Sequence, residues 1–328
     1  MQARTPVRTV SVDEGAEGQR LDNFLIGACR GVPKSHLYRA IRNGEVRVNG
    51  GRCAAERRLV LGDQVRIPPL RLPSAAPSRQ IDTRRWSGVG AALPVVFEDE
   101  ALLVVDKPAG LAVHGGSGVS AGVVEALRAA RPEARFIELA HRLDRDTSGL
   151  LMIAKTRPAL VALHAMLRER QVDKRYLAIV AGRWPRRTRT LDGSLRRYLT
   201  ASGERRVAVD DDGRVAITHV TGLAHRSLPE LGVFSRVAVE IETGRTHQIR
   251  VHLAEAGHPI AGDQKYGDFA LNRALAQAGH RRLYLHAGRL ILRHPLDRRR
   301  LVLDAPAPAE FDALVPMPGH RAAPGETE

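Results

Sequence analysis

The chain carries, at residues 141–151, the sequence HRLDRDTSGLL. Charges of both signs are packed into a turn, and the apolar run that follows predicts a buried strand over 150–154. Functional residues are often carried on loops that a rigid scaffold positions, so this turn is a candidate site. The alternative is a surface turn whose salt bridges have little energetic weight, and mixed-charge turns of that kind are common.

A second polar segment, TGRTHQIRVH, occupies residues 243–252. We predict a helix from about 246 to 256, with Thr246 as its N-cap, because a threonine hydroxyl can accept from an otherwise unpaired backbone amide. A cation such as Arg250 near the positive end of the helix dipole is unfavourable unless an anion pairs with it. We therefore expect a carboxylate or phosphate partner for Arg250. An exposed basic residue on a solvated face is the alternative.

The third segment is KRYLA at residues 174–178, which leads into a predicted strand over 176–180. Tyr176 is one of only five tyrosines in the chain. A tyrosine on a strand can provide a stacking platform for a nucleic-acid base. It can equally be a core tyrosine with a satisfied hydroxyl, and composition does not decide between the two.

The elements around these segments predict a mixed α+β fold. A hairpin is expected from 95–97 and 102–105, helices over 121–130 and 158–170, and a strand that includes Val237, Val239 and Ile241. These strands and helices do not alternate regularly, which argues against a doubly wound sheet. The stretch from about 185 to 230 contains no motif that we can assign.

The chain is expected to divide into four parts. Residues 10–70 form a small α+β unit, with helices from Leu21 and over Lys34–Asn43 and a tight turn at Asn49-Gly50. Residues 71–91 read as a Pro- and Ser-containing linker, and 92–305 as the larger domain. Residues 306–328 read as a Pro- and Ala-rich tail.

The overall charge indicates a polyanionic partner. Lys and Arg number 51 against 36 Asp and Glu, which gives a net charge of +15. Acidic membrane lipid is the competing partner. However, the sequence has no apolar run of about 18 residues and no basic amphipathic helix with an aromatic face. Nucleic acid is therefore favoured, and no membrane association is expected.

Cysteine and histidine usage argues against a metal site. The two cysteines, Cys29 and Cys53, form no CxxC pair, which fits a reducing compartment. His247 and His252 are five residues apart, so a helix does not present them as an i, i+4 metal pair. The N-terminal sequence lacks the apolar core of a signal peptide, and we expect a cytoplasmic protein.

Taken together, the segments resemble the pseudouridine synthases that modify bacterial large-subunit ribosomal RNA, which belong to the RluA superfamily, and most closely those of the RluC type. The sequences at 141–151, 174–178 and 244–253 look like the three signatures of this family, with VVDKPAGLAVHGGSG (104–118) and HPIAGDQKYG (258–267) as flanking matches. The resemblance covers about residues 10–305. It departs from the family pattern at Arg175, just before the key tyrosine.

The resemblance implies a catalytic domain built on a mixed, largely antiparallel sheet with flanking helices. It also implies roles for individual residues. Asp144 matches the essential aspartate and Arg250 the arginine that pairs with it. Tyr176 matches the aromatic residue that stacks on the flipped base, and Arg142 the side chain that enters the RNA stack where the target uridine leaves.

The N-terminal sequences GQRLDNFL and GVPKSHLYRAIRNGEVRVNG resemble the small RNA-binding domain shared with ribosomal protein S-four. Basic residues are the expected RNA contacts in this domain, and two more are expected beside the catalytic helix. These expected contacts are Arg20, Lys34, Arg39, Arg42, Arg47, Arg245 and His247.

The implied reaction needs no cofactor. Uridine and pseudouridine are isomers, so breaking N1–C1′ and forming C5–C1′ requires neither a redox group nor a metal. The base must first leave the stack, which costs a few kcal/mol; Arg142 can offset part of this by filling the gap. Asp144 must be ionised, whether it attacks the nucleoside or removes a ribose proton, and the sequence leaves these two roles open.

Two other functions remain as alternatives. A non-catalytic ribosome-assembly factor would explain the charge and the N-terminal unit but would not require Asp144. An N-glycosylase would also use an aspartate and base flipping, but it would release free uracil. The expected partner is large-subunit ribosomal RNA, and the expected oligomeric state is a monomer.

Overall fold

The computed structural model describes residues 6–13, 16–29, 32–70, 83–115 and 121–318. Its helices are α1 (Leu21–Ala28), α2 (Lys34–Arg42), α3 (Thr83–Ala91), α4 (Val123–Ala130), α5 (Arg157–Arg168), α6 (Gln248–Glu255), α7 (Phe269–Gln277) and α8 (Ala309–Leu314). Its strands are β1 (Arg8–Ser11), β2 (Arg47–Val48), β3 (Gln64–Ile67), β4 (Val95–Glu98), β5 (Leu102–Lys107), β6 (Glu138–Leu139), β7 (Ser148–Ala154), β8 (Asp173–Ala181), β9 (Arg189–Leu191), β10 (Leu195–Leu199), β11 (Arg205–Val209), β12 (Thr218–Leu228), β13 (Gly232–Ile241), β14 (Leu285–Arg293) and β15 (Arg300–Asp304).

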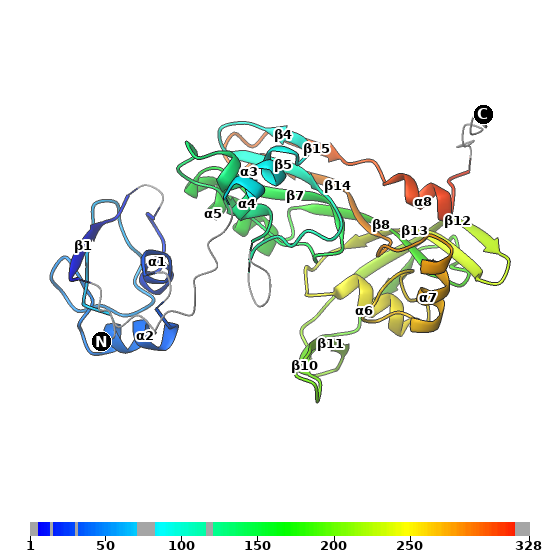
Figure 1. The fold of residues 1–328 in the computed structure, drawn as a ribbon, viewed down its shortest axis with the longest axis horizontal. Coiled ribbons are helices and arrows are strands. Elements are labelled where there is room, and N and C mark those ends of the chain that lie inside the picture. The colour runs from blue at the N-terminus through cyan, green and yellow to red at the C-terminus, as the bar shows by residue number, and fades with distance from the viewer. Residues whose placement is uncertain (1–5, 14–15, 30–31, 71–82, 116–120, 319–328) are drawn as a thin grey trace.

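The N-terminal elements group together around their own core (Figure 1). Strands β1, β3 and β2 form a three-stranded antiparallel sheet in that order, and α1 and α2 bury Leu21, Leu25 and Leu37. Asn49 and Gly50 both have positive φ, at 51° and 78°, as the predicted tight turn requires. Both predicted helices are confirmed, although the predicted unit began at residue 10 and therefore missed the first half of β1.

Asp22 in α1 makes the stability of this unit depend on pH. The hydrogen bonds from Arg20, at 2.7 and 3.1 Å, are the largest cause that lowers the pKa of Asp22 to about 2. The stabilisation is complete above about pH 4 and is lost as the pH falls through the folded-state value. Asp22→Asn should therefore lower stability by about 1 kcal/mol at pH 7, allowing for solvent screening, and the difference should vanish near pH 2. Hydrogen exchange of β1 and β3 amides in the full chain measures this difference in stability. A difference that is unchanged at pH 2 would contradict the stabilising role of ionised Asp22.

The larger part of the chain is built on one sheet, in which the described strands number ten. Its order is β4-β5-β7-β14-β8-β13-β12-β9, with β15 on β14 and β6 on β7. Only the β14–β7 pair among these strands is parallel, so the predicted mixed, largely antiparallel sheet is confirmed. The predicted hairpin is β4–β5, and the predicted buried strand is β7.

Helices cover both faces of this sheet, which explains why β7 is buried along its whole length. Leu151 and Ile153 belong to a core that includes residues of α4, α6, α7 and α8. Leu150 and Met152 point the other way, into a core formed with α5. Side chains that alternate between two apolar layers produce the continuous apolar run seen in the sequence. The loop that carries Asp144 leads directly into this central strand.

The predicted linker was wrong in its second half. Residues 71–82 lie outside the described ranges, as do residues 116–118 of the flanking match, but Thr83–Ala91 forms α3. Helix α3 packs against α4 so closely that a Cβ on Gly90 would lie 2.1 Å from the carbonyl oxygen of Ala126. Only a glycine allows this approach at position 90. The helix was missed because the Pro- and Ser-rich residues before it and its own weak apolar periodicity gave the whole segment the character of a linker.

The predicted tail was also wrong over its first part. Residues 309–314 form α8, and Phe311, Leu314 and Val315 are fully buried in the main core. The segment is Pro- and Ala-rich, but these three apolar residues point inward. Residues 319–328 of the predicted tail lie outside the described ranges.

Leu314→Ala tests whether this segment belongs to the folded core. Removing a fully buried leucine side chain leaves a cavity, so we expect the free energy of unfolding to fall by about 3 kcal/mol. Urea unfolding of the two proteins measures the difference. A free energy of unfolding unchanged by the substitution would mean that α8 does not contribute to the core.

Candidate active site

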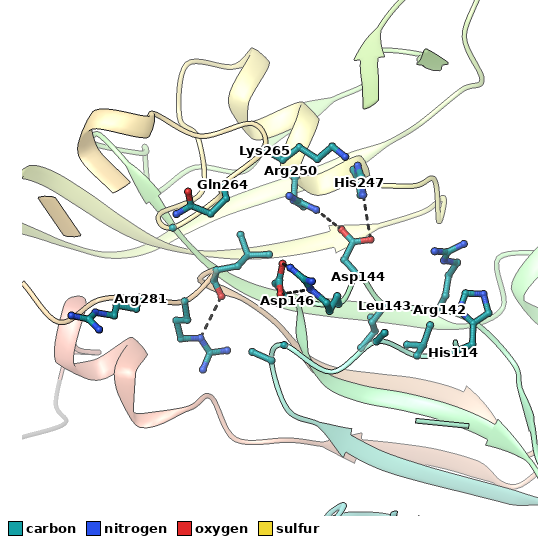
Figure 2. Close-up of a pocket in the computed structure, with 18 of the residues that line it drawn as sticks. His114, Arg142, Leu143, Asp144, Asp146, His247, Arg250, Gln264, Lys265 and Arg281 are labelled. Carbon is teal, nitrogen blue, oxygen red and sulfur yellow. Dashed lines mark hydrogen bonds and ion pairs between the residues drawn. The ribbon is translucent and has the colours of Figure 1, made fainter. Parts of the chain in front are cut away.

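Asp144 lies in the loop between β6 and β7, and its carboxylate faces the first turn of α6 (Figure 2). Arg250 Nη1 donates a hydrogen bond of 2.9 Å to Asp144 Oδ2. The Asp144 side chain is 22% exposed, whereas that of Arg250 is 10% exposed. The carboxylate is therefore held from the protein side and remains accessible from the other. The prediction that Arg250 pairs with an anion is confirmed, and in this structure the anion is a carboxylate.

A second carboxylate, which we did not predict, orients Arg250. Arg250 donates to Asp263 through Nε at 2.7 Å and through Nη2 at 2.8 Å, a two-point contact that fixes the plane of the guanidinium. The side chain of Asp263 is 1% exposed, and its Oδ1 also accepts the backbone N–H groups of Lys265 and Tyr266. Asp263 belongs to HPIAGDQKYG, one of the two flanking segments that resemble the family. That match marked the segment but did not indicate a role for Asp263.

The positive charge of Arg250 and the negative charges of Asp144 and Asp263 stabilise one another. Burial opposes the charge on Arg250, but the hydrogen bond and charge of Asp263, followed by the charge of Asp144, outweigh it and raise the pKa of the guanidinium. Burial likewise opposes the charge on Asp263, but the contact with Arg250 lowers the pKa of that carboxyl overall. Arg250 therefore stays charged and can hold Asp144 in one orientation.

Two buried side chains fix the loop that carries Asp144, and we predicted neither. Lys107 Nζ, at the end of β5, donates to the carbonyl oxygens of Pro108, Leu111 and Arg145, each at 2.9 Å. His141 Nε2 accepts the backbone N–H of Met152 at 3.0 Å. Burial lowers the pKa of Lys107 to about 8 and that of His141 to about 4. The neutral imidazole of His141 is therefore available as an acceptor.

Tyr176 lies on β8, where it is both part of the hydrophobic core and at the wall of a pocket. It is 8% exposed and belongs to the main core, yet it also lines a pocket of about 160 Å³ together with Asp144 and Arg250. Burial is the largest cause that raises the pKa of its hydroxyl, with the charge of Asp144 second. The pocket is smaller than the 300 Å³ or more that drug-sized ligands occupy, which suits a single ring.

A wider groove of about 800 Å³ opens beside this pocket. Its lining is largely basic around the carboxylate of Asp144, as Figure 2 shows. Arg142 is exposed and lines both the groove and the small pocket. Basic residues that line the groove include Arg142, Arg145, His247, Lys265, Arg281 and Arg282. Such a surface suits the phosphate backbone of a nucleic acid.

The start of α6 differs from the prediction. Its N-cap is His247, which has a left-handed φ of 56° and no side-chain capping bond, so Thr246 is not the cap. Instead, the Thr246 hydroxyl accepts from the guanidinium of Arg197. The side chain of Gln248 turns back to accept the backbone N–H of Arg245 at 3.1 Å. Arg245 Nε donates to the carbonyl of Val215 at 3.1 Å.

The basic residues of the N-terminal unit fall into two groups. Lys34, Arg39 and Arg42, three of the expected RNA contacts, are all exposed along α2. Arg20 is instead engaged with Asp22, and Arg47 donates to the carbonyl of Gly50 at 3.0 Å. Helix α2 therefore presents three exposed basic side chains on one short element.

Among the residues that the structure describes, no group of three histidine, cysteine or acidic side chains is arranged to hold a metal ion. None of the helices in these same ranges is long and apolar enough to cross a membrane.

On this sheet a loop aspartate is held by an arginine from α6 at the mouth of a small pocket beside a basic groove, and comparisons with known proteins identify the class. The chain belongs to the RNA pseudouridylate synthase family, whose model matches residues 101–255 and so spans the Asp144 loop, β8 and α6. Among solved structures, human RNA Pseudouridylate Synthase Domain Containing 1 superposes with a TM-score of 0.57 at 27% identity, covering 68% of this chain and 87% of that one.

Within the family the chain is similar to proteins named Ribosomal large subunit pseudouridine synthase C. It is 45% identical over 309 residues to the protein of Pasteurella multocida, covering 94% of this chain and 93% of that one. It is 46% identical over 310 residues to the protein of Escherichia coli K12, covering 93% and 95%. The resemblance inferred from the sequence signatures is thereby confirmed.

Proposed function

We propose that this enzyme converts uridines of large-subunit ribosomal RNA to pseudouridine and that Asp144 performs the chemistry. The observation that carries the proposal is the Asp144 carboxylate, held at 2.9 Å by Arg250 at the mouth of a pocket lined by Tyr176. The similarity to large-subunit synthases, over more than nine-tenths of both chains, supports the substrate. The net charge of +15 supports an RNA partner.

The reaction breaks the N1–C1′ bond, turns the uracil and joins C5 to C1′. The hydrogen on C5 is then lost to solvent as a proton and N1 takes up a proton, so atoms and charges balance without an oxidant, a nucleotide or a metal. The pocket holds the detached ring so that it cannot diffuse away, and Tyr176, which lines the pocket, stacks on one side of the ring. Arg250 keeps Asp144 oriented, whether the carboxylate attacks C1′ or removes a ribose proton.

Arg142 is proposed to fill the gap left by the flipped uridine, because it is exposed and lines both the groove and the base pocket. Arg142→Ala should slow turnover on a structured RNA by about 10- to 100-fold, since a few kcal/mol of unstacking is no longer offset. The loss should be smaller on an RNA in which the target uridine is already unstacked. Single-turnover kinetics on the two RNAs measure this. Equal losses on both would contradict the gap-filling role.

The N-terminal unit is proposed to be a separate RNA-binding domain that helps to select the substrate, with α2 as its contact surface. Its exposed Lys34, Arg39 and Arg42 support this role. Arg245 and His247 are proposed to contact RNA beside the catalytic aspartate, as residues of the pocket. We further infer that the enzyme acts as a cytoplasmic monomer; its mass in solution, measured by sedimentation with and without RNA, tests the oligomeric state.

The substrate class is tested by comparing RNA transcripts labelled with tritium at C5 of uridine. Unmodified large-subunit RNA should release tritium, whereas small-subunit RNA should not. Release from small-subunit RNA alone would contradict the proposed substrate but keep the reaction. Binding of RNA without any release would favour the assembly-factor alternative.

A further inference from the structure

The hydroxyl of Tyr266 lies behind the catalytic cluster, where three segments of the chain meet. It lies 2.7 Å from His247 Nδ1 at the start of α6 and accepts the backbone N–H of Val207 from β11 at 3.0 Å. The Tyr266 ring lies 5.2 Å from the guanidinium carbon of Arg250. Its backbone N–H donates to Asp263 Oδ1 at 3.0 Å. Tyr266 therefore contacts His247, Arg250 and Asp263, the residues that surround Asp144, but not Asp144 itself.

Hydrogen-bond accounting favours one tautomer of His247. The Val207 N–H can only donate, so the Tyr266 oxygen is the acceptor in that contact. The single hydroxyl proton is then free to be donated, and His247 Nδ1 is the acceptor within reach. With Nδ1 as acceptor, the neutral imidazole carries its proton on Nε2. That nitrogen faces Asp144 Oδ1 at a distance of 3.8 Å (Figure 2).

The surroundings of His247 favour this neutral form. Burial is the largest cause that lowers its pKa, and the positive charges of Arg250 and Lys265 act in the same direction. The carboxylates of Asp144 and Asp263 act in the opposite direction, more weakly than burial. The groups that face this imidazole thus come from the Asp144 loop, from α6 and from the segment around 263–266.

The backbone of His247 is strained in a way that points to function. Its φ of 56° lies in the left-handed region, which costs a residue other than glycine about 1–3 kcal/mol and is concentrated at active sites. This conformation turns the imidazole away from the helix surface, toward both the Tyr266 hydroxyl and Asp144. A side chain held by strained backbone and by one directional hydrogen bond has a defined orientation.

We propose that Tyr266 is a positioning residue for the isomerisation: its hydroxyl holds the His247 imidazole with Nε2–H directed at Asp144 Oδ1 and joins this arrangement to β11. The inference rests on the proposed function and extends it to a residue outside the base pocket. Arg250 hydrogen-bonds to one carboxylate oxygen at 2.9 Å, and His247 Nε2 faces the other at 3.8 Å, so each oxygen of Asp144 has its own neighbour. Misplacing a reacting group by about 1 Å can cost 100-fold in rate.

Tyr266→Phe is the direct test, because it keeps the ring and removes only the hydroxyl. We expect kcat to fall by about 10-fold, with KM for RNA little changed. Tyr284→Phe is a matched control, since the Tyr284 hydroxyl bonds to His280 Nδ1 at 2.9 Å in a similar edge-on ring pair. Both variants lose one Tyr–His hydrogen bond, but only Tyr266→Phe should lower kcat. Equal losses of kcat would indicate a merely structural role and overturn the proposal.

A double-mutant cycle shows whether Tyr266 acts through His247. The variant that combines Tyr266→Phe with His247→Ala should have the same kcat as His247→Ala alone. Fold-losses that multiply would overturn the proposal. Nitrogen chemical shifts of His247 give a readout that needs no turnover: Nε2 should carry the proton in the wild-type protein, and a proton on Nδ1 would also overturn the proposal. Absence of pseudouridine formation by the wild type would instead contradict the proposed function and leave these shifts as the test.

Discussion

Asp144→Asn is expected to lower the rate of pseudouridine formation by about 10³-fold or more. The amide is nearly the same size as the carboxylate, but it can neither attack C1′ nor remove a proton. Since phosphate contacts carry most of the affinity for RNA, binding should change little. Tritium release under single-turnover conditions measures the rate, and filter binding measures the affinity.

Asp146→Asn provides the control in the same loop. Asp146 pairs with Arg145 at 3.1 Å on the surface, with both side chains well exposed, and such pairs contribute little. The rate should therefore change by only a few-fold. If Asp146→Asn lost as much activity as Asp144→Asn, the assignment of the chemistry to Asp144 would be wrong.

Arg250→Met should have the second large effect, on stability and activity together. It leaves the carboxylate of Asp263 buried without its two-point partner, a change that costs about 3–5 kcal/mol in comparable buried pairs. It also frees Asp144 to rotate, so activity should fall about 100-fold even where the protein is folded. Urea unfolding and tritium release measure the two effects.

The two effects can be separated with a second substitution. Adding Asp263→Asn to Arg250→Met removes the unpaired charge and should recover part of the stability, but none of the activity. Arg250→Lys should be intermediate, because an ammonium cannot make the planar two-point contact and reach Asp144 at once. An Arg250→Met protein as stable as the wild type would contradict the role of the Asp263 contact.

The parts of the fold that could be predicted are those with a strong local signal. The apolar run after Asp144 indicated β7, because a strand between two apolar layers shows no alternation. The position of Arg250 near the start of a predicted helix was enough to predict an anionic partner for it. The pairing of Arg250 with Asp144 in particular came from the family resemblance, since the two residues are 106 positions apart.

What could not be predicted depends on contacts between distant segments. Lys107 supports the Asp144 loop only because β5 lies beside β7, and Asp263 meets Arg250 only because the segment after α6 folds back over it. Neither side chain has a local pattern that indicates its partner. The β10–β11 hairpin likewise lies in the stretch without a motif, yet its Val207 reaches Tyr266 beside the active site.

The most direct test is the product balance of wild-type enzyme with unmodified large-subunit RNA labelled at C5 of uridine. Each pseudouridine formed should be matched by one tritium released to solvent, with no free uracil and an intact RNA chain. Free uracil in step with abasic sites would identify a glycosylase and contradict the isomerisation. RNA binding without tritium release would contradict catalysis on this RNA altogether.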